Sequence, residues 1–126
     1  MPHKVLLIED DGNMLCLLQT LLEFEGFQVI HFSDGTIEGI LTAMQLEMPS
    51  LALIDVNLPH VNGLNLLKRI RRDASLKCMH VLMSSGMDYS SECLQEGADD
   101  FILKPYMPDE LIRTIQQTLS AEQLTG

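Results

Sequence analysis

Short runs of apolar residues alternate along the chain with longer stretches in which apolar residues recur every three or four positions. The short runs have the length of strands, and the longer stretches have the spacing of one buried helix face. The pattern predicts strands at 4–8, 27–32, 51–55, 79–83 and 100–103. It predicts helices at 13–25, 37–48, 62–72, 89–96 and 108–119, with 120–126 as a tail or the start of a linker.

Several boundaries carry residues that cap or end helices. Gly26 follows the first helix, residues 33–35 offer a cap for the second, and Pro108 opens the last. Within the apolar stripes, Leu17 in the first helix and Met48 at the end of the second are expected to face the core.

The run at 51–54 leads directly into Asp55 and lies between Pro49 and Pro59. A continuous apolar run of this length is typical of a strand that is buried on both faces. Asp55 would then stand at the carboxyl end of a buried strand, which is the edge where ligands bind in open α/β sheets. For an Asp taken alone, capping or turning the following loop is the more common role.

Five strands that alternate with five helices predict an α/β fold with a parallel sheet, because a helix between two strands connects them by a right-handed crossover. A length of 126 residues fits one domain with its own core. The chain contains no internal repeat and no low-complexity segment.

The charge balance is acidic, with 18 Asp and Glu against 8 Lys and Arg and a net charge of −10. This does not suit a phosphate backbone, so we expect no direct nucleic-acid binding. No apolar run approaches the roughly 18 residues of a membrane span and no signal peptide opens the chain, so we expect a cytoplasmic protein without membrane segments. The cysteines are expected to be reduced and packed as small apolar residues: Cys16, Cys78 and Cys93. The basic residues of the third helix are expected on its solvent side: Lys68, Arg69, Arg71 and Arg72.

Polar residues stand at the carboxyl ends of predicted strands: Glu9, Asp10, Asp55, Ser84, Ser85 and Lys104. Parallel strands end at one edge of their sheet, so these side chains are expected to meet, although each alone has an ordinary structural role. Two carboxylates about 4 Å apart repel by roughly 4 kcal/mol at an effective dielectric of about 20. Three acids with one lysine therefore predict a Mg²⁺ ion with oxygen ligands. Metal, lysine, hydroxyl and carboxylate together suit phosphoryl transfer to Asp55.

In combination these residues closely resemble a known family. Asp55 stands in Leu-Ile-Asp-Val-Asn-Leu-Pro, Ser85 follows thirty residues later, and residues 97–105 read Gly-Ala-Asp-Asp-Phe-Ile-Leu-Lys-Pro. Over about 4–119 the chain is similar to the receiver domain of two-component response regulators. The resemblance implies one receiver domain over 1–126, with a doubly wound (βα)5 three-layer sandwich. It also implies a flavodoxin-like sheet of five parallel strands in the order 2-1-3-4-5.

The resemblance also implies roles for the acidic residues. Asp55 would accept a phosphoryl group from a sensor histidine kinase or a phosphotransfer protein. Mg²⁺ would be held by Asp10, Asp55 and the backbone carbonyl of Asn57, with Glu9 acting through water. The chain would thus catalyse only its own phosphorylation and dephosphorylation, and would not be an enzyme with a separate substrate.

Further roles follow from the same resemblance. Lys104, in a cis bond to Pro105, would pair with the phosphoryl group, and Ser85 and Phe101 would move as switch residues. The switch would change the face built by the predicted elements at 89–96, 100–103 and 108–119. This face would control an output domain, a partner protein or a homodimer.

Departures from the family pattern are modest. Glu9 replaces the commoner Asp, Ser85 replaces Thr, and Phe101 replaces a frequent Tyr. Met87, two residues beyond Ser85, cannot orient an attacking water as an acid or amide could, and its flexible apolar chain can cover the phosphoryl group. Slow hydrolysis of the phosphoaspartate is therefore expected, although Asn57 could still hold a water.

Two other functions stay open. An aspartyl-phosphate phosphohydrolase carries a second acid two residues after its nucleophile, where this chain has Asn57. A pseudo-receiver binds partners without phosphorylation, although the acceptor, metal and lysine positions are intact here. A homodimer through the switch face is expected not to be held by ion pairs, because Asp99 and Asp100 have only Arg113 nearby and Thr114 replaces an arginine.

Overall fold

All strand pairings of the central sheet are parallel, as expected for strands connected by helices. The computed structural model describes residues 3–32 and 35–125, with side chains through Ser120. The strands lie in the order β2-β1-β3-β4-β5 and are β1 (Lys4–Ile8), β2 (Gln28–His31), β3 (Leu51–Asp55), β4 (His80–Ser85) and β5 (Asp100–Leu103). The helices are α1 (Gly12–Phe24), α2 (Ile37–Glu47), α3 (Gly63–Arg72), α4 (Ser90–Gln95) and α5 (Pro108–Thr125).

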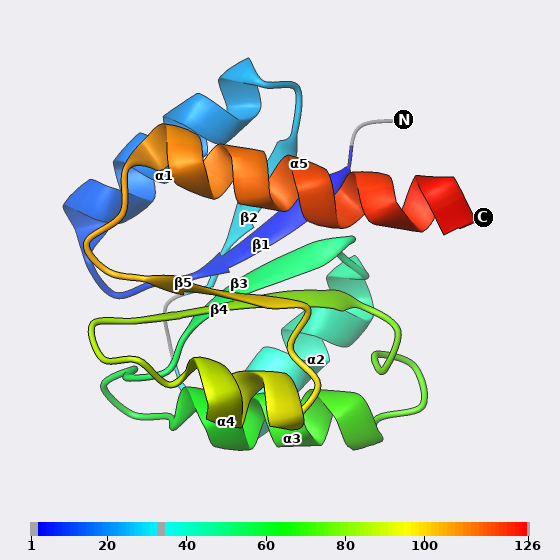
Figure 1. Ribbon diagram of the computed structural model, residues 1–126. Helices are drawn as coiled ribbons and strands as arrows, with labels where there is room; N and C mark the ends of the chain where they lie inside the picture. The colour runs from blue at the N-terminus through cyan, green and yellow to red at the C-terminus, as the bar shows by residue number, and fades with distance from the viewer. Residues whose placement is uncertain (1–2, 33–34, 126) are drawn as a thin grey trace.

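The helices cover both faces of the sheet. Figure 1 shows α1 and α5 on one face and α2, α3 and α4 on the other, which confirms the doubly wound, three-layer prediction. Alternating side chains of β1 supply both cores: Leu6 and Ile8 join the cluster under α2 and α3, and Val5 and Leu7 join the cluster under α1 and α5. β3 is central, and all five of its residues are buried, Asp55 included. Burial on both faces explains why a continuous apolar run precedes Asp55.

Side-chain oxygens cap the first three helices. Asp11 accepts two backbone N–H bonds at the start of α1, Thr36 accepts one at the start of α2, and Asn62 accepts two at the start of α3. The cap predicted at 33–35 falls partly on residues 33 and 34, which lie outside the described residues. The observed cap of α2 is the neighbouring Thr36.

Two predictions about apolar side chains are wrong. Leu17 is 44% exposed, because the buried face of α1 is centred on Leu18 and Leu22, with Leu15 and Leu21 packed on either side of them. Met48 is 57% exposed, because α2 ends at Glu47 and Met48 adopts a left-handed backbone with φ 47°. Helical spacing predicts that a helix has a buried face, but not which residues lie at the borders of that face.

The last helix is longer than predicted. It continues beyond Leu119 to Thr125, since the sequence there supplies the helix formers Ala, Glu, Gln and Leu. Neither α5 nor any other helix in the described part of the chain is both long and apolar enough to cross a membrane.

The cysteines occupy different environments. Cys93 is buried, as predicted, and burial with a smaller contribution from Glu92 raises the pKa of its thiol to about 11. Cys16 and Cys78 are exposed instead, so the expectation that all three pack as small apolar residues is wrong for these two.

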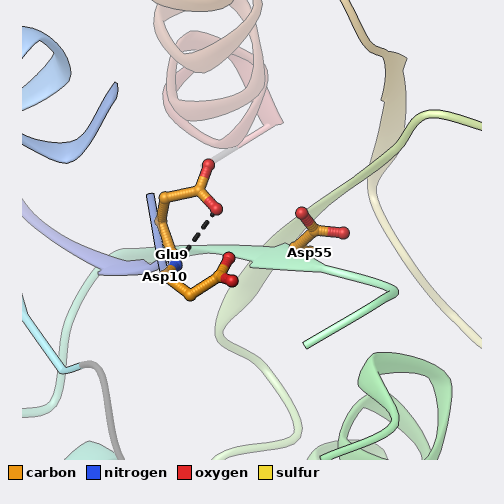
Figure 2. A group of neighbouring side chains, drawn as sticks. All are labelled: Glu9, Asp10 and Asp55. Atoms are coloured by element: carbon orange, nitrogen blue, oxygen red, sulfur yellow. Dashed lines mark hydrogen bonds between the residues drawn. The ribbon is translucent and has the colours of Figure 1, made fainter. Parts of the chain in front are cut away.

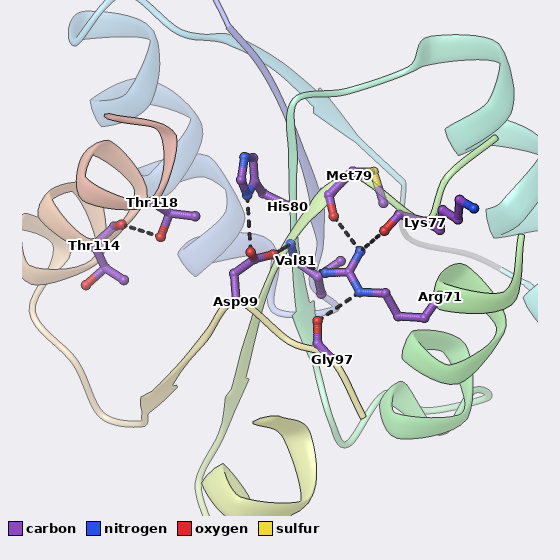
Figure 3. Close-up of polar contacts among 9 residues, drawn as sticks. All are labelled: Arg71, Lys77, Met79, His80, Val81, Gly97, Asp99, Thr114 and Thr118. Carbon is purple, nitrogen blue, oxygen red and sulfur yellow. Dashed lines mark hydrogen bonds and ion pairs between the residues drawn. The ribbon is translucent and has the colours of Figure 1, made fainter. Parts of the chain in front are cut away.

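The helical pattern predicted Arg71 on the solvent side of α3, but its guanidinium group contacts other segments of the chain. Its Nε donates to the carbonyl oxygen of Gly97 at 2.8 Å, and its Nη1 donates to the carbonyl oxygens of Met79 at 2.6 Å and Lys77 at 3.0 Å (Figure 3). Its Nη2 lies 3.1 Å from the Asp99 carboxylate. We call these contacts the Arg71 clamp. It joins α3 to the segments that precede β4 and β5, at the amino-terminal edge of the sheet.

Asp99 extends the Arg71 clamp into the sheet. Its carboxylate accepts the backbone N–H of Val81 at 2.7 Å and lies 3.2 Å from Nδ1 of His80. One acid therefore joins the first residues of β4 to the segment before β5, which are otherwise held by strand pairing.

The Arg71 clamp predicts that Arg71→Ala lowers the free energy of unfolding by about 1–3 kcal/mol, because several carbonyl oxygens lose their donor together. The measurement is urea unfolding. The exposed Arg72 gives a matched control, and Arg72→Ala should change stability by less than about 0.5 kcal/mol. Equal effects of the two substitutions would show that the clamp contributes nothing specific.

Candidate functional site

Three carboxylates meet at the carboxyl edge of the sheet, where the sequence predicts a site. Glu9 and Asp10 follow β1, and Asp55 is the last residue of the neighbouring β3. One carboxylate oxygen from each lies within 4.8 Å of the others (Figure 2). Glu9 and Asp55 are buried and Asp10 is exposed, so the cluster meets solvent on the side of Asp10.

Lys104 brings an ammonium group to this cluster. Its Nζ donates to Oδ2 of Asp55 at 2.6 Å and to Oε1 of Glu9 at 3.3 Å. It follows β5 directly, and its backbone N–H donates to the carbonyl oxygen of Ser85 at 2.8 Å. The bond from Lys104 to Pro105 is cis, as predicted. The lysine thus links residues from three separate strands.

The charges in the cluster do not balance. Burial raises the pKa of the Glu9 carboxyl, and the Asp55 charge adds to this, although Lys104 opposes it. For Lys104 itself, burial acts to lower the pKa, but hydrogen bonds and charge from Asp55 and Glu9 outweigh burial and the pKa is raised. Lys104 therefore stays charged at neutral pH, and its single positive charge faces the three carboxylates of the cluster.

This donor set fits a hard divalent cation. Such ions bind carboxylate and carbonyl oxygens, and Mg²⁺ keeps several of its waters while it takes one or two carboxylates. Glu9, Asp10 and Asp55 present three carboxylates against one lysine, and one of the three is open to solvent. The cluster could therefore hold a metal ion.

Ser85 ends β4 beside the acidic cluster and has no exposed surface. Its hydroxyl oxygen accepts a hydrogen bond from Nδ2 of Asn57 at 3.0 Å and another from the backbone N–H of Met87 at 3.1 Å. Asn57 in turn donates its backbone N–H to Oδ1 of Asp55 at 2.9 Å. The loops after β3 and β4 are therefore joined next to Asp55.

Phe101 lies apart from this group. It pairs with Met83 in the ladder between β4 and β5, and its half-buried ring packs against the core under α2, α3 and α4. The other predicted residues, namely Glu9, Asp10, Asp55, Asn57, Ser85 and Lys104, are brought together at the carboxyl edge.

Gly63 is a site residue that sequence reasoning missed. A Cβ at this position would lie 2.3 Å from the carbonyl oxygen of Asp55 and 2.7 Å from Cα of Val56, so no side chain fits there. The Gly63 N–H donates to the Val56 carbonyl oxygen at 2.8 Å. The Asn-Gly pair at 62–63 signalled a helix start, but not this close approach of α3 to the residue after Asp55.

Solved structures similar to this one include receiver domains. The chain aligns with a CheY-like response regulator receiver domain protein from Methanospirillum hungatei with a TM-score of 0.87 and 29% identity, over the full length of both chains. It aligns with a Francisella response regulator receiver domain with a TM-score of 0.83 and 26% identity, over 95% of this chain and 98% of the other. The fold is therefore CheY-like and flavodoxin-like, as predicted.

The sequence comparisons agree with the fold. The model of the response regulator receiver domain family matches residues 5–116, so the chain belongs to this family of two-component signalling domains. It is 36% identical over 126 residues to the transcriptional regulatory protein GltR of Pseudomonas aeruginosa, covering 98% of this chain and 51% of GltR. It is 31% identical over 119 residues to the DNA-binding response regulator MtrA of Mycobacterium tuberculosis, covering 94% of this chain and 51% of MtrA. The chain thus spans about half the length of these relatives.

We expect Gly63→Ala to destabilise the fold by about 1–3 kcal/mol, because the added methyl group meets backbone atoms that cannot rotate away. Thermal or urea unfolding measures this, and the amide resonances of residues 55–57 should shift most. Gly12 starts α1 with nothing within 4 Å of an added Cβ, so Gly12→Ala is the matched control and should be neutral or stabilising. An unchanged stability of the Gly63 variant would contradict the close approach.

Proposed function

We propose that Asp55 accepts a phosphoryl group from a histidine kinase or a phosphotransfer protein, in a reaction that requires Mg²⁺. The observation that supports this most directly is the pairing of a buried Asp55 carboxylate with Lys104, 2.6 Å away, inside a cluster with a surplus of acids. A carboxylate oxygen of Asp55 would attack phosphorus, and the phosphorus–nitrogen bond of the donor phosphohistidine would break, leaving the electron pair on the imidazole.

The residues around Asp55 would share the work of positioning. Asp10, Asp55 and the backbone carbonyl of Asn57 would hold the ion, and Glu9 would act through a bound water. The ion, when bound, neutralises negative charge that develops on the phosphoryl oxygens. Lys104, already charged and in place, would keep its hydrogen bond to Asp55 and also pair with a phosphoryl oxygen.

The contacts around Asp55 give less support to the two alternative functions. A phosphohydrolase needs a general acid two residues after the nucleophile, and here that residue is Asn57, whose amide is hydrogen-bonded to Ser85. A pseudo-receiver would need no acidic cluster with a paired lysine. We therefore favour a phosphorylated receiver, not an enzyme with a separate substrate.

The output of the signal would pass through α4, β5 and α5. Ser85 ends β4 and Phe101 lies in the adjoining strand β5, so a change at Asp55 would reach this face through them. We propose that the face controls an output domain, a partner protein or a homodimer, and that any nucleic-acid contact belongs to such a partner, because this acidic chain carries a net charge of −10. As part of the same proposal, we place this protein in the cytoplasm.

A homodimer through this face would not be held by Asp99. That carboxylate is engaged in the Arg71 clamp, and Arg113 lies 4.0 Å from Asp109 on its own helix. Leu94 and Leu103 are each 50% exposed on α4 and β5, so apolar contact is the better basis for self-association.

Asp55→Asn should abolish phosphorylation, because the amide is not a nucleophile of comparable strength. The test incubates the protein with acetyl phosphate and Mg²⁺ and follows intact mass, with chelation of the ion as a second negative control. Labelling of the Asn variant at the native rate would remove Asp55 as the acceptor, and with it the proposed function.

Asp10→Ala should weaken Mg²⁺ binding at least tenfold and leave the fold intact or slightly more stable without metal. The substitution removes one negative charge from a repulsive cluster. Calorimetric titration with Mg²⁺ and urea unfolding in a chelator give the two readings. Asp11→Asn, at the adjacent helix cap, also removes a charge and should retain most of the Mg²⁺ affinity. If both variants bound Mg²⁺ equally well, Asp10 would not be a ligand.

Met87→Glu should speed decay of the phosphorylated protein several-fold. Met87 is 63% exposed and its Sδ lies 3.8 Å from the Tyr89 hydroxyl, so it does not cover Asp55 in this structure. The expected slow hydrolysis then rests on its inability to orient a water, which a carboxylate can do. A tenfold change in rate needs only about 1.4 kcal/mol of barrier. Decay is measured in Mg²⁺ after removal of the phosphodonor. An unchanged rate would show that residue 87 does not affect hydrolysis of the phosphoaspartate.

A further inference from the structure

The side chain of Asn57 makes a long-range contact that metal binding does not use. Its Nδ2 donates to the Ser85 hydroxyl oxygen at 3.0 Å, although the residues belong to loops after different strands. Its backbone N–H meanwhile donates to Oδ1 of Asp55 at 2.9 Å. Asn57 therefore contacts the acceptor residue and the switch hydroxyl at the same time, through different parts of one residue.

Both acceptor positions of the Ser85 hydroxyl are filled. A serine oxygen accepts two hydrogen bonds and donates one. Asn57 Nδ2 supplies the first donor and the Met87 backbone N–H supplies the second, at 3.1 Å. Among the described residues, no hydrogen bond joins the Ser85 hydroxyl to Asp55. The two donors thus hold this buried oxygen in a position from which it makes no hydrogen bond to the acceptor carboxylate.

We propose that the Asn57 amide is a latch: it holds the Ser85 hydroxyl in the unphosphorylated position, and Ser85 must break this bond before it can donate to a phosphoryl oxygen on Asp55. The proposal rests on the proposed function, since it concerns the response to a phosphoryl group. Asn57 is here a positioning residue, because its side chain acts on Ser85 and not on the reacting atoms.

The latch is favoured because its two residues, Ser85 and Asn57, differ in solvent exposure. Ser85 is fully buried, so its oxygen cannot exchange Asn57 for water without moving. Asn57 is exposed, so its released amide would be solvated at little cost. The unphosphorylated state therefore gains about one hydrogen bond that the switched state lacks, and the switch is biased toward the resting position.

Beryllofluoride, a phosphoryl mimic that is not hydrolysed, tests the latch at equilibrium. Its affinity should be measured by calorimetry at saturating Mg²⁺ for the native protein, Asn57→Ala, Ser85→Ala and the double variant. We expect Asn57→Ala to bind beryllofluoride about three- to tenfold more tightly, as loss of one net hydrogen bond in the resting state requires. In the Ser85→Ala background the same substitution should have no effect.

A further reading separates the latch from a general disturbance of the loop. Because all variants are compared at saturating Mg²⁺, a change in Mg²⁺ affinity does not enter the comparison. The amide resonance of Met87, which shares the Ser85 hydroxyl, should shift in unliganded Asn57→Ala toward its position in the beryllofluoride-bound native protein. Asn65→Ala, an exposed amide on α3, is the control and should change none of these values.

The outcomes distinguish the latch from the function on which it rests. If Asn57→Ala bound beryllofluoride no more tightly, or if its effect persisted without the Ser85 hydroxyl, the latch would be refuted while the phosphorylated receiver stood. If the native protein neither bound beryllofluoride nor took phosphate from acetyl phosphate, both proposals would fail together.

Discussion

Burying the carboxylates of Glu9 and Asp55 beside each other would be prohibitive without the ammonium group of Lys104. The two acids end or follow adjacent strands, and the lysine reaches them from the far edge strand, 2.6 Å from one and 3.3 Å from the other. Such an arrangement requires β5 to end beside β4 and the loops after β1 and β3 to lie close together. The carboxyl edge of the sheet is thus organised around one buried ion-pair group, and the surplus of carboxylates there could hold a metal ion.

Much of this arrangement can be predicted from the sequence. The apolar runs locate the strands, and right-handed crossovers make the sheet parallel, so residues such as Asp10, Asp55 and Lys104 must converge although they are far apart in the chain. The resemblance to receivers then supplies the strand order, which the fold confirms. The roles assigned to the individual site residues stay predictions.

The features that could not be predicted from the sequence depend on distances between helices, strands and loops. Gly63 looks like an ordinary helix start, and only the approach of α3 to the Asp55 carbonyl explains why it has no side chain. Arg71 falls on the polar side of its helix by periodicity, yet its long stem carries the guanidinium group back to carbonyl oxygens of other segments. The bond between Asn57 and Ser85 likewise joins residues that no local pattern relates.

The Arg71 clamp also bears on how local stability is distributed along β4. At its first residues, the Val81 N–H is bonded to a carboxylate that is itself held by a guanidinium group. At its last residue, the hydroxyl of Ser85 is held by an exposed amide. The Val81 amide hydrogen should therefore exchange with solvent only through large, rare openings that also release the Arg71 clamp. A rearrangement of the Ser85 side chain beside Asp55 would take place at the opposite end of the strand from this clamp, so it need not loosen the whole sheet.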